Sequence, residues 1–240
     1  SSFNLSAKFS FPYSAVSDVD YSELKDERDA QYDIIAQYAN SNNAEEIGLR
    51  NTASERIGEI DQLRYKWLEF YKVKFKGEWY TKVVGNLVLK PTFEFGFLGA
   101  YNNDRGIIPF ERFFLGGDGL GTYSLDGREA IALRGYPNQS LSSQDGGSIY
   151  NKFSLELRHP ITLAQQTKIF ALAFLEGGNS YNDFKNFNPF NIKRSAGIGL
   201  RIFMPAFGLL GIDFGHGFDP LPGEVQKSGW QTHFIIGQQF

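Results

Sequence analysis

Stretches of about ten residues with alternating apolar and polar side chains are the feature that most constrains the fold. Successive side chains of a β-strand point to opposite faces, so this alternation predicts strands with one apolar and one polar face. A strand of roughly ten residues is long enough to cross a lipid bilayer at a tilt. About eight such strands are predicted, at residues 3–11, 65–79, 87–97, 149–158, 167–178, 195–203, 209–218 and 230–240.

The segments between these strands alternate in length. Long connections at residues 14–64 and 99–147 are separated by short ones such as 80–86 and 159–166. Outer-membrane barrels have long extracellular loops and short periplasmic turns. We therefore expect an all-β fold, an antiparallel transmembrane β-barrel in which residues 1–240 form a single domain.

A soluble β-sandwich would show the same alternation with the polarity of its faces reversed, so the alternation alone does not separate the two folds. The polar faces carry small residues and charges of both signs, as a barrel lumen does. Aromatic residues near strand ends suit the membrane interfaces; they are Trp67, Trp79, Tyr80, Tyr101 and Trp230. These features favour the membrane barrel.

Composition removes several classes of function. The net charge is -3, with both signs spread along the chain, which provides no basic surface for nucleic acid. The chain has 3 histidines and no cysteine, and the histidines lack metal-ligand spacing. The GGDGLG stretch, Gly116 to Gly121, has no following Lys-Ser or Lys-Thr and is interpreted as a loop. No serine-hydrolase motif occurs, so we expect no cofactor, no metal and no enzyme activity.

Residues 18–63 differ from the rest of the chain because they are charged and favour helix. Asp20 and Glu23 have capping-box spacing, and Ile34, Ile35 and Tyr38 could form a short apolar stripe. We interpret this segment as a solvated, partly helical extracellular loop rather than a docking site.

Two acidic residues on polar faces raise the question of charge compensation. Glu156 and Glu176 come from consecutive predicted strands, and like charges inside a barrel are costly without a cation. Arg134 is a candidate partner, because a guanidinium can bridge carboxylates. Gly135 permits a sharp backbone path beside it, and Tyr136 would be a rigid anchor. The alternative is that Arg134 points into water at a loop tip.

Several stretches together resemble the C-terminal half of the barrel in the BamA family of outer-membrane protein assembly factors, a surface-antigen type of barrel. They are Leu133-Arg134-Gly135-Tyr136, Ser154 to Leu157, Phe174 to Asn179, Ser195 to Arg201 with Pro205 and Gly208 to Leu210, and His233 to Phe240. The last is similar to the β-signal of outer-membrane proteins. The resemblance covers roughly residues 65 to 240, and several details resemble the form found in Bacteroidetes-type Gram-negative bacteria.

This resemblance implies that Arg134 reaches into the lumen and pairs with Glu176 and Glu156. It also implies that Phe170, Leu172 and Phe174 face the lumen with Glu176, and that Ile169, Ala171, Ala173 and Leu175 face lipid. Family members have about sixteen strands and periplasmic POTRA domains, whereas this sequence shows about eight strands and no POTRA domain. We expect either half of a larger barrel, as a piece of a longer protein, or a closed eight-stranded barrel.

The function that the resemblance implies is insertion of nascent β-barrel proteins into the bacterial outer membrane, together with accessory subunits and the lipid bilayer. The last strand would form one side of the seam at which a substrate strand pairs; its residues are Trp230, Phe234, Ile236, Gly237 and Phe240. The alternatives are a related transporter that secretes polypeptides and a passive or engineered mini-barrel.

Overall fold

The computed structural model describes residues 1–119, 128–164, 167–204 and 208–237. The chain divides into two compact units. The sheet unit consists of Ser1–Ala7, Lys72–Leu98 and Pro109–Phe240, and the helical unit of Lys8–Tyr71 and Gly99–Ile108. The single domain over residues 1–240 stays a prediction.

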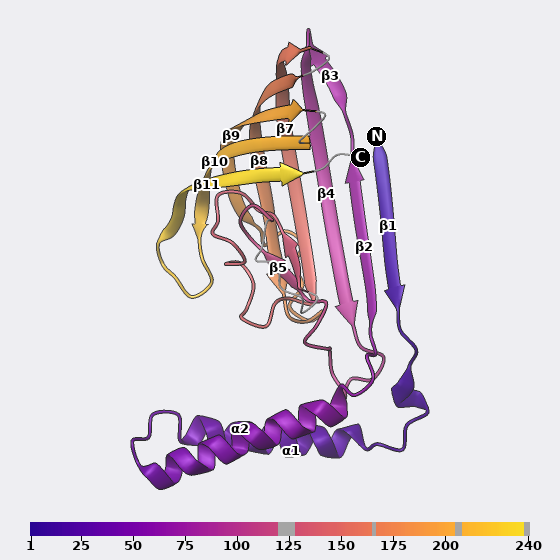
Figure 1. Ribbon diagram of the computed structural model, residues 1–240, viewed down its shortest axis with the longest axis vertical. Helices are drawn as coiled ribbons and strands as arrows, with labels where there is room; N and C mark the ends of the chain where they lie inside the picture. The colour runs from indigo at the N-terminus through magenta and orange to yellow at the C-terminus, as the bar shows by residue number, and fades with distance from the viewer. Residues whose placement is uncertain (120–127, 165–166, 205–207, 238–240) are drawn as a thin grey trace. The chain divides into compact units, whose positions relative to one another are not determined.

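Nine strands form one sheet in the order β1-β2-β4-β7-β8-β9-β10-β11, with β3 paired to β4 (Figure 1). The strands are β1 Ser2–Phe9, β2 Tyr71–Glu78, β3 Thr81–Val84, β4 Leu87–Gly99, β7 Ile149–Leu163, β8 Lys168–Tyr181, β9 Lys193–Met204, β10 Gly208–Pro220 and β11 Lys227–Gly237. Neighbouring strands from β4 to β11 pair in antiparallel fashion. The predicted antiparallel β fold is confirmed.

Some predicted strand limits were wrong. The second strand begins at Tyr71 rather than at residue 65. Glu69 was the one residue that broke the alternation there, and it is fully buried in the helical unit, where its carboxylate accepts hydrogen bonds from the backbone N–H (2.7 Å) and the hydroxyl (2.6 Å) of Ser14. The fourth predicted strand, β7, continues past Pro160 to Leu163, with a register shift between Pro160 and Thr162. A bulge of this kind lets a strand pass a proline.

Three short strands were not predicted. Residues Thr81–Val84, which we expected to be a turn, form β3 and pair with β4. The long connection at 99–147 contains β5 Phe113–Leu115 and β6 Glu129–Ile131, which pair in parallel. These elements are three or four residues long, too short for a period-two pattern to reveal.

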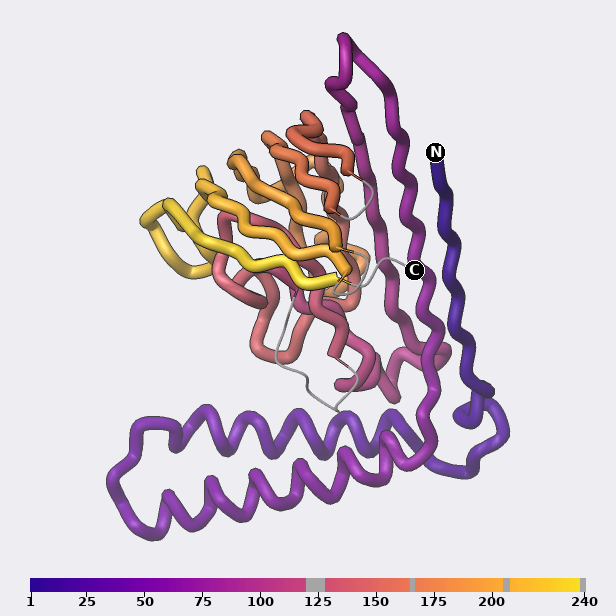
Figure 2. The backbone as a smooth tube through the Cα atoms, turned by 45° about the horizontal axis from the view of Figure 1, so that its top comes forward, coloured from indigo at the N-terminus to yellow at the C-terminus, as the bar shows by residue number. Residues whose placement is uncertain are grey.

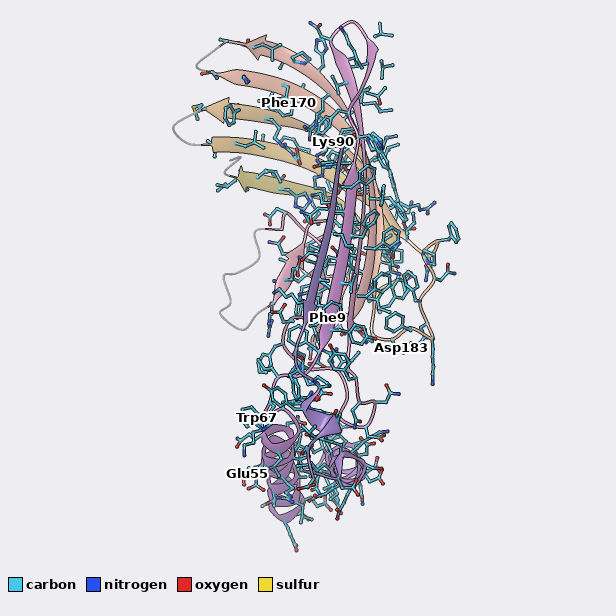
Figure 3. All side chains as sticks on the ribbon, turned by 90° about the vertical axis from the view of Figure 1, so that its right-hand side faces the viewer. Phe9, Glu55, Trp67, Lys90, Phe170 and Asp183 are labelled. Carbon is cyan, nitrogen blue, oxygen red and sulfur yellow. The ribbon has the colours of Figure 1, made fainter. Side chains whose placement is uncertain are left out.

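The register of β4, β7, β8, β9, β10 and β11 assigns the paired side chains of these strands to one of two faces. The inner face, as we call it, carries Glu156, Glu176, Asp213 and His233, since Glu156 is opposite Phe174 and Asp213 is opposite His233. Lys90 and Phe170, labelled in Figure 3, belong to it as well. In β8 the inner-face Leu172, Phe174 and Glu176 are buried, whereas Ala173 and Leu175 on the outer face are exposed. This agrees with the facing that the resemblance implies for the central part of β8.

The hydrophobic core of the sheet unit lies between the inner face and the long connection that contains β5. Its buried apolar residues include Phe113, Phe114, Leu115, Leu133, Tyr136, Leu141, Tyr150, Leu172 and Phe174. Figures 1 and 2 show β5 and residues 128–148 of this connection alongside strands β7–β11 of the same unit. We call residues Ala132–Ser148 the inner loop.

The helical unit contains α1 Tyr21–Gln37, α2 Ala44–Arg64 and the short 3-10 helix Tyr13–Ala15. Asp20 caps α1 by accepting hydrogen bonds from the backbone N–H groups of Ser22 (3.0 Å) and Glu23 (3.2 Å), so the predicted helix start is confirmed. The ion pairs Arg56–Glu27 (2.7 Å) and Arg28–Asp61 (2.9 Å) join the two helices. Ile34, Ile35 and Tyr38 are half-buried. No helix in the described ranges is long and apolar enough to span a membrane.

Candidate functional site

Arg134 is the centre of a buried ionic cluster between the inner loop and the sheet. Its guanidinium contacts Glu176 of β8 at 2.6 Å, Glu156 of β7 at 2.8 Å and Asp213 of β10 at 3.0 Å. It also lies over the ring of Phe174, 3.8 Å from the ring centre. The planar, five-donor guanidinium suits this arrangement because one group can bind several carboxylates at once.

The structure brings together all three residues of the expected charge cluster, Arg134, Glu156 and Glu176. The alternative, in which Arg134 points into water, does not hold, since Arg134 is only 5% exposed. The third carboxylate, Asp213, was missed. The available signal was its position: Asp213 lies on the polar face of its predicted strand, which otherwise carries glycines.

Further cations complete the cluster. Arg201 of β9 binds Asp213 at 2.5 Å, Arg158 binds Glu156 at 2.6 Å, and Lys152 lies 3.6 Å from Glu176. Each buried carboxylate therefore has a second cationic neighbour besides Arg134. Full pairing matters here because a buried charge that loses its partner costs about 3–5 kcal/mol.

Ion pairing and burial together set the protonation states of Arg134 and Tyr136 in the inner loop. Burial acts to lower the pKa of Arg134, but the negative charges of Glu176, Glu156 and Asp213 outweigh it and hold this pKa above its usual range. Burial raises the pKa of Tyr136 to about 12. Both side chains thus keep one protonation state through the physiological range.

Gly135 is required where it stands, for two reasons. Its φ of +87° is in the left-handed region, which other residues adopt rarely. A Cβ at this position would lie 2.8 Å from Cβ of Ser195 and 3.0 Å from the backbone N of Gly217. Gly215 has a matching constraint, since its own Cβ would lie 2.7 Å from the Gly135 nitrogen. The glycines on the polar face of β10 therefore allow the inner loop to approach the sheet.

The Arg134-Gly135-Tyr136 triplet contacts all five strands from β7 to β11. Arg134 binds β7, β8 and β10, and the Tyr136 hydroxyl donates to the carbonyl of Arg194 in β9 at 2.7 Å. The Gly135 N–H donates to Nε2 of His233 at 2.8 Å, and the Ser228 hydroxyl donates to the Gly135 carbonyl at 2.8 Å. Both partners belong to β11, and neither was predicted.

The predicted seam residues lie at one end of the sheet order. Trp230, Phe234 and Ile236 share the outer face of β11 and are 70%, 57% and 65% exposed. Gly237 ends β11, and Phe240 lies outside the described residues. In the described part of the chain, β11 pairs with β10, and β1 and β11 stand at opposite ends of the sheet order.

Another buried cation, outside the Arg134 cluster, lies on β2. Lys72 is 2% exposed and contacts the carboxylates of Glu111 and Glu129, each at 2.8 Å. It also binds the backbone carbonyl of Glu111, a non-glycine residue with φ of +62°. Lys72 therefore ties the start of the long connection to the inner side of β2. Within the described ranges, no group of three or more His, Cys, Asp or Glu residues is placed to hold a metal ion.

Comparison with known proteins identifies the family of this chain. Residues 6–240 match the Omp85 superfamily domain. No match occurs among the curated proteins. Among solved structures, the chain is similar to BamA from Haemophilus ducreyi lacking POTRA domains 1-3, with 19% sequence identity and a TM-score of 0.49. That alignment covers 69% of this chain and 34% of the other, so this chain spans about a third of that protein's length. Because the domain match extends over nearly all of its residues, the chain belongs to the Omp85 superfamily.

Proposed function

We propose that this protein is a BamA-type assembly factor of the bacterial outer membrane, in which β11 templates the folding and insertion of nascent β-barrel proteins. It would act by strand pairing, without covalent catalysis. The observation that carries the proposal is the position of β11, which pairs with β10 along one edge and stands last in the sheet order. Its outer face exposes Trp230, Phe234 and Ile236.

The physical argument rests on backbone hydrogen bonds. An edge strand presents unpaired N–H and C=O groups, and each such group in hydrocarbon costs several kcal/mol. An incoming strand that pairs with β11 would remove this cost for both chains at once. Addition of a strand to an exposed edge draws its affinity from main-chain hydrogen bonds, which suits clients that differ in sequence.

The inner loop supports this role by holding the strands that lead to the edge. Arg134 joins β7, β8 and β10 through three carboxylates, and Gly135 and Tyr136 bind β11 and β9. A template strand must keep its register while a client pairs with it. The buried cluster provides a fixed support on the inner face and leaves the outer face free for lipid.

Reconstitution tests the proposal. The 240-residue chain is placed in liposomes, a urea-unfolded outer-membrane β-barrel protein is added, and its folding is followed by heat-modifiable mobility in gels. We expect faster folding than in empty liposomes, with the client in the membrane. Protease-protected client inside the vesicles would instead support a polypeptide-secreting transporter. No acceleration, with the chain itself folded, would indicate a passive barrel, and both of these outcomes contradict the proposal.

A further inference from the structure

The inner loop is attached to β11 by two hydrogen bonds that converge on one residue. Gly135 donates its N–H to Nε2 of His233 at 2.8 Å and accepts at its carbonyl from the Ser228 hydroxyl at 2.8 Å. We infer that His233 and Ser228 form a latch that holds β11 against the inner loop, and that protonation of His233 weakens it by removing one of its two hydrogen bonds. We call these two hydrogen bonds the β11 latch.

The latch consists of the contacts that the Arg134-Gly135-Tyr136 triplet makes with β11. Arg134 and Tyr136 bind strands β7 to β10, so Gly135 is the member of the triplet that binds β11. Along its own length β11 pairs with β10, from Leu209↔Gly237 to Pro220↔Lys227. A movement of β11 away from the inner loop would therefore have to break the latch, while the Arg134 cluster could stay intact.

The chemistry of His233 makes one bond of the latch conditional on its charge. A neutral imidazole has one nitrogen that accepts and one that donates. Because Nε2 accepts from Gly135, the proton of neutral His233 is on Nδ1. In the imidazolium both nitrogens carry protons, so Nε2 would face the Gly135 N–H with a hydrogen of its own. The His233 bond is then lost, and the Gly135 N–H is left buried without its acceptor.

Burial of the imidazole, together with the neighbouring charges, decides at what pH this happens. Asp213 of β10 is the register partner of His233, and Asp118, Glu176 and Arg134 also act on its imidazole. The carboxylates favour the imidazolium, whereas Arg134 and burial oppose it. Asp213 and Glu176 are already bound by Arg134. An unperturbed histidine changes its charge near pH 6.5, and the experiment below determines the midpoint in this setting.

The biological role of the latch rests on the proposed function. Because β11 is the strand with which a client would pair, release of β11 from the inner loop would regulate that pairing. The latch itself is nevertheless a physical property that can be measured with no client present. Failure of the insertion assay with an intact pH-dependent latch would overturn the function alone. Insertion by a protein whose β11 shows no dependence on His233 would overturn the latch alone.

Hydrogen–deuterium exchange of the 240-residue chain in nanodiscs is the test. Backbone exchange of β11 peptides is compared at about pH 7.5 and about pH 5.5, after correction for the intrinsic rate, with β8 peptides as internal reference. Loss of one hydrogen bond is worth about 1 kcal/mol, so we expect exchange in β11 to rise by roughly fivefold to tenfold at the lower pH. Equal corrected rates at both pH values would overturn the inference.

Variants separate the hydrogen bond from simple packing. His233→Gln offers a carbonyl acceptor that does not titrate, so slow exchange at both pH values is expected. His233→Leu removes the acceptor, and fast exchange at both is expected. Ser228→Ala should raise exchange modestly and keep the pH dependence. If His233→Leu fails to fold, as judged by heat-modifiable mobility, His233→Gln still decides the matter.

His216→Gln is the matched control. His216 lies on the outer face of β10, where its ring contacts the rings of Phe218 and Trp230, each with a centroid distance of 5.2 Å. It is thus a second histidine beside β11 that does not touch the latch through its side chain. The pH dependence should persist in His216→Gln and vanish in His233→Gln. The reverse pattern would assign the effect to His216 and refute the latch.

Discussion

Arg134 and Glu176 are joined twice, although 42 residues separate them in the sequence. The Arg134 guanidinium donates to Oε1 of Glu176 at 2.6 Å, and the backbone N–H of Arg134 donates to Oε2 at 2.9 Å. One carboxylate on β8 thereby fixes both the side chain and the backbone of the inner loop.

Glu176→Gln should destabilise the sheet unit. The change keeps the shape of the side chain but removes a buried charge that faces Arg134. Breaking a buried pair costs about 3–5 kcal/mol, and the remaining partners Glu156 and Asp213 place the expected loss near the lower value. Urea unfolding in detergent, followed by tryptophan fluorescence, measures the change in the free energy of unfolding.

The control for this change is Glu59→Gln. Glu59 pairs with Arg56 on the surface of α2, where the two side chains are 64% and 42% exposed. Exposed ion pairs contribute little to stability, because water and salt screen the attraction between the two charges. Equal stability losses in Glu59→Gln and Glu176→Gln would contradict the assigned importance of the buried cluster.

Gly135→Ala should displace the inner loop. Alanine meets both a left-handed backbone, which costs about 1–2 kcal/mol, and the close approach of Ser195 and Gly217. Gly223→Ala is the matched control, because Gly223 has a similar φ of +81° and open space around its Cβ position. A larger loss of unfolding free energy in Gly135→Ala isolates the packing contribution. Equal losses would mean that the loop does not need its close contact with β10.

Asp213→Asn should be as damaging as Glu176→Gln. Asp213 is fully buried and binds two guanidinium groups, Arg134 at 3.0 Å and Arg201 at 2.5 Å. Asparagine keeps one acceptor but leaves both cations undercompensated, so we expect a loss of about 3 kcal/mol. The double variant Asp213→Asn with Arg201→Gln should lose less than the sum of the single changes, because the two residues share one interaction. Strict additivity would argue against their coupling.

Tyr136→Phe should have a small and specific effect. The change removes the hydrogen bond from the Tyr136 hydroxyl to the Arg194 carbonyl of β9 and keeps the buried ring. A single hydrogen bond of this kind contributes about 1 kcal/mol. Thermal unfolding should show this modest loss, with the mobility of the folded form in gels unchanged. A loss as large as that of Glu176→Gln would mean that the ring itself had moved.

The sequence allowed the strands and their faces to be predicted because period-two alternation is a local signal. Glu176 could be placed beside Phe174 on the inner face from parity and the resemblance together. The pairing of Arg134 with Glu156 and Glu176 followed from charge compensation and the resemblance. Asp213 obeyed the same parity, but nothing in the sequence indicated that β10 lies within reach of Arg134.

The parts that were missed depend on contacts between distant residues. His233 and Ser228 lie 98 and 93 residues from Gly135, and no local pattern marks a histidine as the acceptor of a loop amide. The early start assigned to the second strand has a similar cause. Glu69 was treated as a strand residue, whereas a tertiary contact with Ser14 determines its position.

Site-specific disulfide formation tests the central claim, that a client strand pairs with β11, most directly. The chain has no cysteine, so a single cysteine can be placed on β11 at Phe234 or on β8 at Leu175. Both positions lie on the outer face, but β8 is paired on both sides. A client with one cysteine in its terminal strand is added during insertion. We predict disulfides at Phe234→Cys in a single register and none at Leu175→Cys; equal yields at both positions, or insertion without any β11 disulfide, would contradict the account.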